Sequence, residues 1–190
     1  MRQLLAMAAL DLETRERLAA DGSLFEGYHL EMQAVHEANA DALAELIERH
    51  GWPTQALVGE DGAEATWLIA QHAISRPDFC RRCLAELRAT ASAGAVPPWQ
   101  PAYLEDRIRV FEGRPQRCGN SFDWDEQGQI SPNPIEEPES VDQRRAAVGL
   151  GPLSAAIERH RHDSASQPRP VDLANRRQEM DAWAREVGWR

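Results

Sequence analysis

The segment from Leu30 to His50 constrains the fold more than any other part of the chain. Gly51 supplies a C-terminal stop and Pro53 cannot continue the helix. A helix this long with one inward face must pack against other apolar surfaces, so the segment predicts a helical domain. The residues of the inward face recur at helical spacing and are Met32, His36, Asn39, Leu43 and Leu46/Ile47.

Most of the remaining chain shows the same helical periodicity. The predicted fold class is therefore all-α or mainly α, a bundle-like single domain with one short peripheral β-hairpin near residues 116–134. We expect a helical domain with a polar pocket over residues 1–157, a linker over 158–170 and a tail helix over 171–190. Further helices are expected over residues 2–20, 61–74, 77–91, 100–111, 141–148, 153–162 and 171–187.

Composition excludes several classes of function. The formal net charge is -10 and the chain contains no lysine, which excludes a lysine nucleophile and argues against nucleic-acid binding. No run of 18 apolar residues occurs, so we expect a cytoplasmic protein without a membrane helix. The arginine pairs 81–82, 144–145 and 176–177 are interpreted as solvated surface. Cys80 and Cys83 have CxxC spacing but lie within a predicted helix, which favours small, partly buried residues over a redox or zinc site.

Polar residues inside the predicted helices are the candidates for function. His36, His72 and Asp106 are predicted as catalytic, because imidazoles and carboxylates exchange protons near neutral pH. Two of them also have an ordinary interpretation: His36 as a core histidine, and Asp106 with Arg107 as an internal salt bridge. Asp11 and Arg15 have the spacing of a structural helix pair. The predicted substrate-binding residues are Arg107, Asn39, Gln71, Tyr28, Tyr103, Gln116 and Trp67.

Several motifs together resemble a bacterial family of unknown function that is frequent in actinobacteria. They are Gly51-Trp52-Pro53, Trp67-Leu-Ile-Ala-Gln71-His72-Ala73, Ala102-Tyr-Leu-Glu-Asp106-Arg107 and Gly113-Arg-Pro-Gln116, within a resemblance that covers about residues 6–153. Such proteins usually continue from Gln116 with Tyr-Gly-Thr-Gln, where this chain has Arg117-Cys118-Gly119-Asn120. The resemblance implies a shared site but no reaction.

Three functions fit these residues. The first is a small cofactor-independent enzyme that hydrolyses, eliminates or cyclises an amide- or carboxylate-bearing metabolite through His/Asp acid-base chemistry. The second is a metal-dependent enzyme in which His36, His72 and Asp106 hold zinc or iron. The third is a non-catalytic interaction module with exposed tryptophans, Trp189 among them, as partner anchors. The expected partner is a small-molecule substrate, with no nucleic acid or membrane, and a homodimer is left open.

Overall fold

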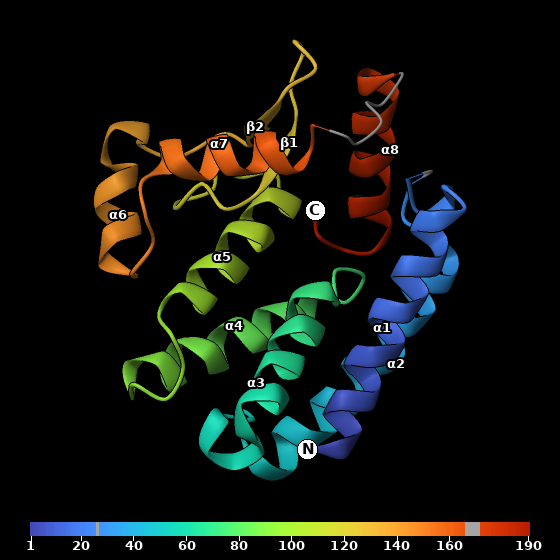
Figure 1. Ribbon diagram of the computed structural model, residues 1–190, viewed down its shortest axis with the longest axis vertical. Coiled ribbons are helices and arrows are strands. Elements are labelled where there is room, and N and C mark those ends of the chain that lie inside the picture. Colours follow the sequence, from blue (N-terminus) through green and yellow to red (C-terminus); the bar gives the residue numbers. More distant parts are fainter. Residues whose placement is uncertain (26, 166–171) are drawn as a thin grey trace. The chain divides into compact units, whose positions relative to one another are not determined.

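The computed structural model describes residues 1–25, 27–165 and 172–190. In these residues the chain is mainly helical with one short antiparallel hairpin, which confirms the predicted fold class (Figure 1). The chain divides into two compact units, Met1–Val96 and Pro97–Arg190. This division falls at a different place from the boundaries expected at 157 and 170.

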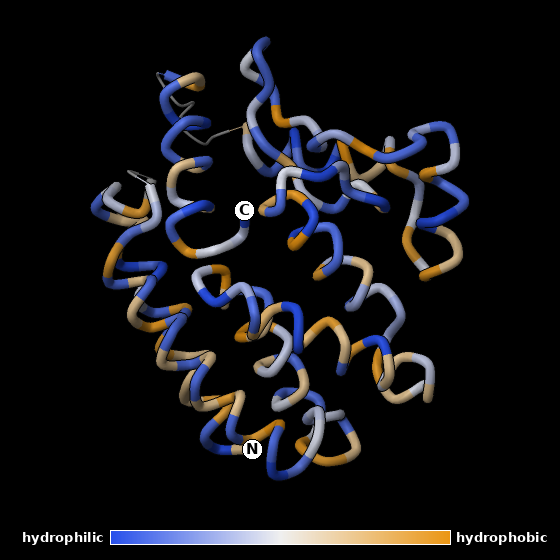
Figure 2. Tube along the Cα trace, turned by 180° about the vertical axis from the view of Figure 1, so that it is seen from behind, coloured by the Kyte–Doolittle hydropathy of each residue, from blue (hydrophilic) through white to orange (hydrophobic). Residues whose placement is uncertain are grey.

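The first unit is built from four α-helices, in which α1 packs against both α2 and α3. Figure 2 shows hydrophobic and hydrophilic residues alternating along α1 and α2, as expected of helices with one buried face. The largest buried apolar side chains include Leu4, Leu43, Ile69 and Leu87. The elements are α1 (Arg2–Ala20), a 3-10 turn η1 (Ser23–Phe25), α2 (Leu30–His50), α3 (Gln55–His72) and α4 (Pro77–Ser92).

Local signals account for the ends of α2. The His29 side chain accepts a hydrogen bond from the backbone N–H of Glu31 at 3.2 Å, which caps the N-terminus. Gly51 ends the helix with a φ of 73°, a conformation that glycine adopts without strain. Both predicted ends, Leu30 and His50, are therefore those observed.

Helix α3 begins earlier than predicted. Its first turn starts at Gln55, whereas the sequence predicted a start at Asp61. Gly59 interrupts the helix with φ 75° and ψ 174°, and the helical path resumes after it. The prediction found only the part of α3 that follows this break.

The buried face of α1 is rotated from the one that its apolar residues suggest. Apolar residues at positions 4, 5, 8, 9 and 12 have the spacing of a helical stripe, yet Leu12 is 51% exposed. The face that is buried contains Leu4, Met7, Ala8, Asp11, Thr14 and Leu18. A carboxylate therefore lies on the inner side of this helix.

The second unit combines short helices with the hairpin. Phe122 pairs with Pro132 and Trp124 with Ile130 in the antiparallel register. Helix α7 continues to Asp163, inside the predicted linker, while residues 166–171, including the predicted start of the tail helix, lie outside the described residues. The elements are α5 (Trp99–Phe111), β1 (Phe122–Trp124), β2 (Ile130–Pro132), η2 (Pro138–Ser140), α6 (Val141–Ala147), α7 (Leu153–Asp163) and α8 (Leu173–Glu186).

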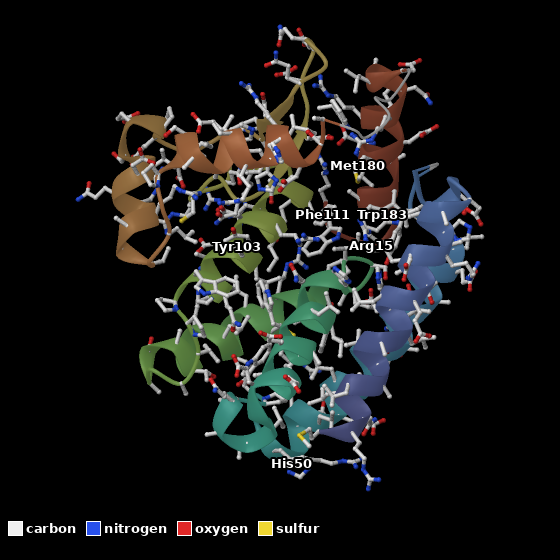
Figure 3. The ribbon with its side chains drawn as sticks, in the orientation of Figure 1. Arg15, His50, Tyr103, Phe111, Met180 and Trp183 are labelled. Carbon is white, nitrogen blue, oxygen red and sulfur yellow. The ribbon has the colours of Figure 1, made fainter. Side chains whose placement is uncertain are left out.

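Aromatic packing joins the C-terminal segment to α5. The ring of Trp189 stacks on Phe111 with centroids 5.3 Å apart, and Trp183 meets the same ring edge-on at 5.6 Å (Figure 3). Trp189 is 3% exposed, so its prediction as an exposed partner anchor is wrong. Its indole instead contributes to the core of this unit.

Across the described parts of the chain, none of the helices has both the length and the apolar character needed to cross a membrane. The three cysteines are buried and free, so Cys80 and Cys83 are more deeply buried than the partial burial expected of them. The Cys80 thiol donates to the carbonyl of Ala73 at 3.1 Å.

Candidate active site and metal centre

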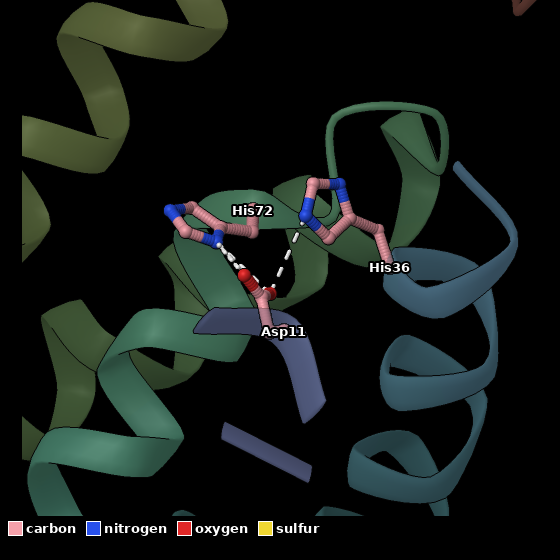
Figure 4. Close-up of side chains that lie close together, drawn as sticks. All are labelled: Asp11, His36 and His72. Atoms are coloured by element: carbon pink, nitrogen blue, oxygen red, sulfur yellow. Dashed lines mark hydrogen bonds and ion pairs between the residues drawn. The ribbon is translucent and has the colours of Figure 1, made fainter. Parts of the chain in front are cut away.

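Three helices of the first unit each direct one ionisable side chain to a common point. Asp11 comes from the middle of α1, His36 from α2, and His72 is the last residue of α3 (Figure 4). The inward orientation of His36 is the one that its helical stripe predicted. The packing of α1 against α2 and α3 thus brings together residues that are far apart in sequence.

The Asp11 carboxylate lies between the two imidazoles. His72 Nδ1 is 3.0 Å from each carboxylate oxygen, and His36 Nε2 is 3.3 Å from Oδ2. The two imidazole ring centroids are 5.1 Å apart. The carboxylate is fully buried, whereas the His72 side chain is 21% exposed, so the centre is accessible from the side of His72.

The imidazoles decide the charge state of Asp11. Burial by itself would raise the pKa of this carboxyl, because the charged form loses its hydration. His36 and His72 outweigh burial and hold the pKa well below its usual range. Asp11 is therefore an anion at neutral pH, able to orient an imidazole N–H or to bind a cation.

Tyr28 and Asn39 support this centre. The Tyr28 hydroxyl lies 2.7 Å from His36 Nδ1, and burial raises the pKa of the phenol, which keeps it protonated. The Asn39 amide donates to the Met7 carbonyl at 3.1 Å and ties α2 to α1 one turn before Asp11. Tyr28 thus meets a proposed catalytic group, whereas Asn39 fixes the helices that carry it.

The two other predicted substrate-binding residues of this unit lie on α3. Trp67 and Gln71 are both partly exposed, and Gln71 directly precedes His72. Their predicted role in substrate binding stays a prediction.

Asp106 lies in the second unit, where a loop surrounds its carboxylate. Its oxygens accept hydrogen bonds from the backbone N–H groups of Arg117, Cys118 and Asn120, at 2.6–3.1 Å, and from the Asn120 amide at 3.0 Å. Burial raises the pKa of Asp106, and these backbone donors oppose the rise. The carboxylate that meets His36 and His72 is therefore Asp11, and the acid-base role of Asp106 stays a prediction.

Arg145 holds the other side of this loop. Its guanidinium donates to the carbonyls of Cys118 and Gly151, each at 2.6 Å, and to the Asn120 side-chain oxygen at 3.2 Å. Asn120 thereby bridges Arg145 and Asp106. Arg145 is only 2% exposed, so its interpretation as solvated surface is wrong. A guanidinium with five fixed donors can be buried where carbonyls converge, and here they do.

Gln116 is a second buried polar residue of the same unit whose side chain makes several hydrogen bonds. Its amide nitrogen donates to the carbonyls of Ser121 and Asn133, at 2.9 and 2.8 Å, and its oxygen accepts from the Ser121 N–H at 2.8 Å. Both amide hydrogens are therefore used within the protein. This geometry ties the start of the hairpin to its return strand, and the predicted substrate contact stays untested.

The remaining two predicted residues, Tyr103 and Arg107, lie on α5. Tyr103 meets Trp99 edge-on, with centroids 5.5 Å apart. Arg107 lines a cavity of about 690 Å³ within the second unit, together with Phe122, His160 and residues of α8. The tail helix therefore contributes to a cavity wall.

Comparison with known proteins identifies the family. Residues 1–165 match a family of unknown function (DUF6624). The chain belongs to this family. Neither the curated proteins nor the solved structures contain a match. Membership of DUF6624 covers both Asp11–His36–His72 and the Asp106 loop, and it assigns no reaction to either.

Asp11 is the one residue of the centre that sequence reasoning missed in this DUF6624 protein. Its spacing to Arg15 suggested an ordinary structural helix pair, whereas its carboxylate contacts His36 and His72. A signal was present: Asp11 lies seven residues after Leu4 and seven before Leu18, which places it on the same helical face as both. An acid flanked in this way by buried leucines indicates an internal partner.

Proposed function

We propose that the first unit carries the catalytic centre of an enzyme, formed by Asp11, His36 and His72. The observation that carries this proposal is the contact of one fully buried carboxylate with two imidazoles from different helices. Buried ionisable groups are costly to keep unless they are paired, and clusters of this kind are frequent at functional sites.

In the metal-free protein, Asp11 sets the tautomer of His72. The carboxylate accepts a hydrogen bond from Nδ1–H, so Nε2 carries the lone pair and is the general base. When Nε2 takes a proton, the imidazolium that forms is stabilised by the adjacent Asp11 anion. Acid-base catalysis of this kind contributes roughly 10²- to 10⁴-fold in rate.

His36 and Tyr28 complete the proton arrangement. The Tyr28 O–H donates to His36 Nδ1, which places the remaining proton on Nε2, facing Asp11. In this state His36 is neutral and directs its N–H toward the carboxylate. Its role is to help hold Asp11 as an anion, while proton transfer takes place at His72.

The proposed substrate is a small amide- or carboxylate-bearing metabolite that undergoes hydrolysis, elimination or cyclisation in the cytoplasm. The net charge of -10 disfavours nucleic acid as a partner. A homodimer is compatible with this proposal.

We also propose that the motifs of residues 51–53, 67–73 and 102–107 mark a mainly bacterial, largely actinobacterial family.

Turnover of a metabolite panel by the untagged protein tests this function. The panel contains small amides, lactams and hydroxy- and amino-carboxylates, and products are detected by mass spectrometry. On the substrate that the panel identifies, we expect His72→Ala and Asp11→Asn to lower kcat/KM by about 10²- to 10⁴-fold.

His50→Ala is the matched control. His50 ends α2, about 20 Å from His36 by the helical rise, and is exposed (Figure 3). It should turn over substrate like the wild type. Unchanged kcat/KM in both His72→Ala and Asp11→Asn would exclude the centre as the catalytic site.

A further inference from the structure

We infer that Asp11, His36 and His72 form a binding site for a divalent transition-metal ion of the zinc or iron type. One donor atom from each residue can be chosen so that all three lie within 4.8 Å of one another. Imidazole and carboxylate are ligands that these ions share. The ion would be the cofactor of the centre described above. Only its role in catalysis rests on the proposed function.

Two of the three donor separations are close to those of a coordinated ion. Metal–ligand bonds of about 2.0–2.2 Å in tetrahedral geometry place neighbouring donors about 3.4 Å apart. Asp11 Oδ2 is 3.3 Å from His36 Nε2 and 3.0 Å from His72 Nδ1. Small rotations of the side chains would therefore admit an ion without moving the helices.

His36 Nε2 supplies an independent observation. Among the described residues, no acceptor has the geometry of a hydrogen bond to this buried nitrogen, although Asp11 Oδ2 is 3.3 Å away. A buried polar atom without a partner is rare in native proteins. An ion between the imidazole and the carboxylate would give this nitrogen a well-aligned partner, which the Asp11 carboxylate alone does not provide.

Tyr28 is placed as an outer partner of a metal-bound histidine. Its oxygen lies 2.7 Å from His36 Nδ1, the ring nitrogen opposite the proposed donor. Metal-binding histidines commonly donate this second N–H to an oxygen, which fixes the tautomer and the ring orientation. With an ion on Nε2, His36 Nδ1–H would donate to the Tyr28 hydroxyl.

The charge and ligand count favour a reactive rather than a structural ion. One carboxylate and two neutral imidazoles leave a divalent ion with a net charge of about +1, and three protein ligands leave a position for water. The partial exposure of His72 provides access to that position. A bound ion would lower the pKa of this water, so that proton removal would no longer depend on the His72 imidazole as it does in the metal-free form.

Metal binding is measured on untagged full-length protein after treatment with a chelator. Calorimetric titrations with Zn²⁺, Co²⁺ and, without oxygen, Fe²⁺ are compared, and Co²⁺ is also followed by its visible absorption. We expect about one ion per chain, with affinity lowered at least about 100-fold in Asp11→Asn and His72→Ala. The relative affinities for Zn²⁺ and Fe²⁺ identify the ion type.

Two further variants separate coordination from general effects on the fold. Tyr28→Phe should bind the same ion about 10- to 100-fold more weakly, because the ligand His36 loses its outer partner. His50→Ala should bind like the wild type, with circular dichroism confirming that each variant is folded. The inference is overturned if the wild-type protein binds none of the three ions. It is also overturned if Asp11→Asn and His72→Ala both bind the ion as tightly as the wild type.

The metal inference and the proposed function fail separately. Loss of turnover in His72→Ala without metal binding by the wild type leaves acid-base catalysis and removes the metal. Tight binding that depends on Asp11 and His72, with turnover unaffected by either variant, leaves a metal site that is not catalytic.

Discussion

Asp11 shows how a single charged residue can be kept inside a helical unit. Burying an unpaired carboxylate costs on the order of several kcal/mol in lost hydration free energy. Two imidazoles replace that hydration, with His72 Nδ1 in contact with both oxygens. The same contacts make the three residues interdependent, because removing either imidazole exposes the carboxylate to an apolar interior.

Gln116 allows a direct test of a structural role. Replacing it with leucine removes three side-chain hydrogen bonds, which takes the side-chain donor from the Asn133 carbonyl and the acceptor from the Ser121 N–H. We expect Gln116→Leu to lower the free energy of unfolding by about 2–4 kcal/mol, measured by urea denaturation. Gln127→Leu, at an exposed position of the hairpin turn, should change it by less than about 0.5 kcal/mol. Equal effects in the two variants would contradict this assignment.

Helix ends that are set by nearby residues could be predicted from the sequence. The contacts between helices that form the site could not. The ends of α2 follow from a cap and a glycine that can be read directly in the sequence. The rotation of α1 was missed, because Leu12 and Asp11 are adjacent and apolar character alone favours burial of the leucine. His36 was therefore predictable as an inward residue, while its carboxylate partner was assigned to Asp106.

Gly59 provides a test at the level of one helix. Its φ of 75° with ψ of 174° belongs to a region that essentially only glycine adopts. Gly59→Ala should lower the free energy of unfolding by about 1–3 kcal/mol, measured by urea denaturation. Gly151→Ala, at a glycine with no positive φ and nothing within 4 Å of an added Cβ, should be neutral or slightly stabilising. If Gly59→Ala is as stable as the wild type, residue 59 does not need the backbone conformation that only glycine adopts.

For the whole chain, the two compact units carry different kinds of polar interior. In Met1–Val96 a carboxylate meets two imidazoles, whereas in Pro97–Arg190 the buried Asp106 and Arg145 are satisfied mainly by main-chain groups. The predicted site combined residues from both units, because helical periodicity tells which residues face inward but not which of them meet.

The stability of the molecule should depend on pH through His160. Burial, followed by the nearby Arg159, lowers the pKa of this histidine, whose ring stacks on Phe122 with centroids 4.0 Å apart. The unfolded chain then takes up the proton first as pH falls from 7 to 5, so the free energy of unfolding decreases over this range. His160→Phe keeps a stacked ring without a titrating group, so its free energy of unfolding should decrease less between pH 7 and pH 5 than that of the wild type.

Urea denaturation at pH 7 and pH 5 measures this difference. His162→Gln is the control, because His162 follows on the same helix with a side chain that is 90% exposed. It should lose as much stability as the wild type between the two pH values. If His160→Phe loses as much as His162→Gln, another group is responsible for the pH dependence.

The loop around Asp106 has a consequence for how this family can diverge. Three of the four groups that bind the carboxylate are main-chain N–H groups, which every residue except proline provides. Substitutions at the exposed Arg117 can therefore change the surface of the loop while its path is conserved. Evolution can vary such a segment at little cost in folding, and relatives that keep the same scaffold can differ here in the chemical character of their surface.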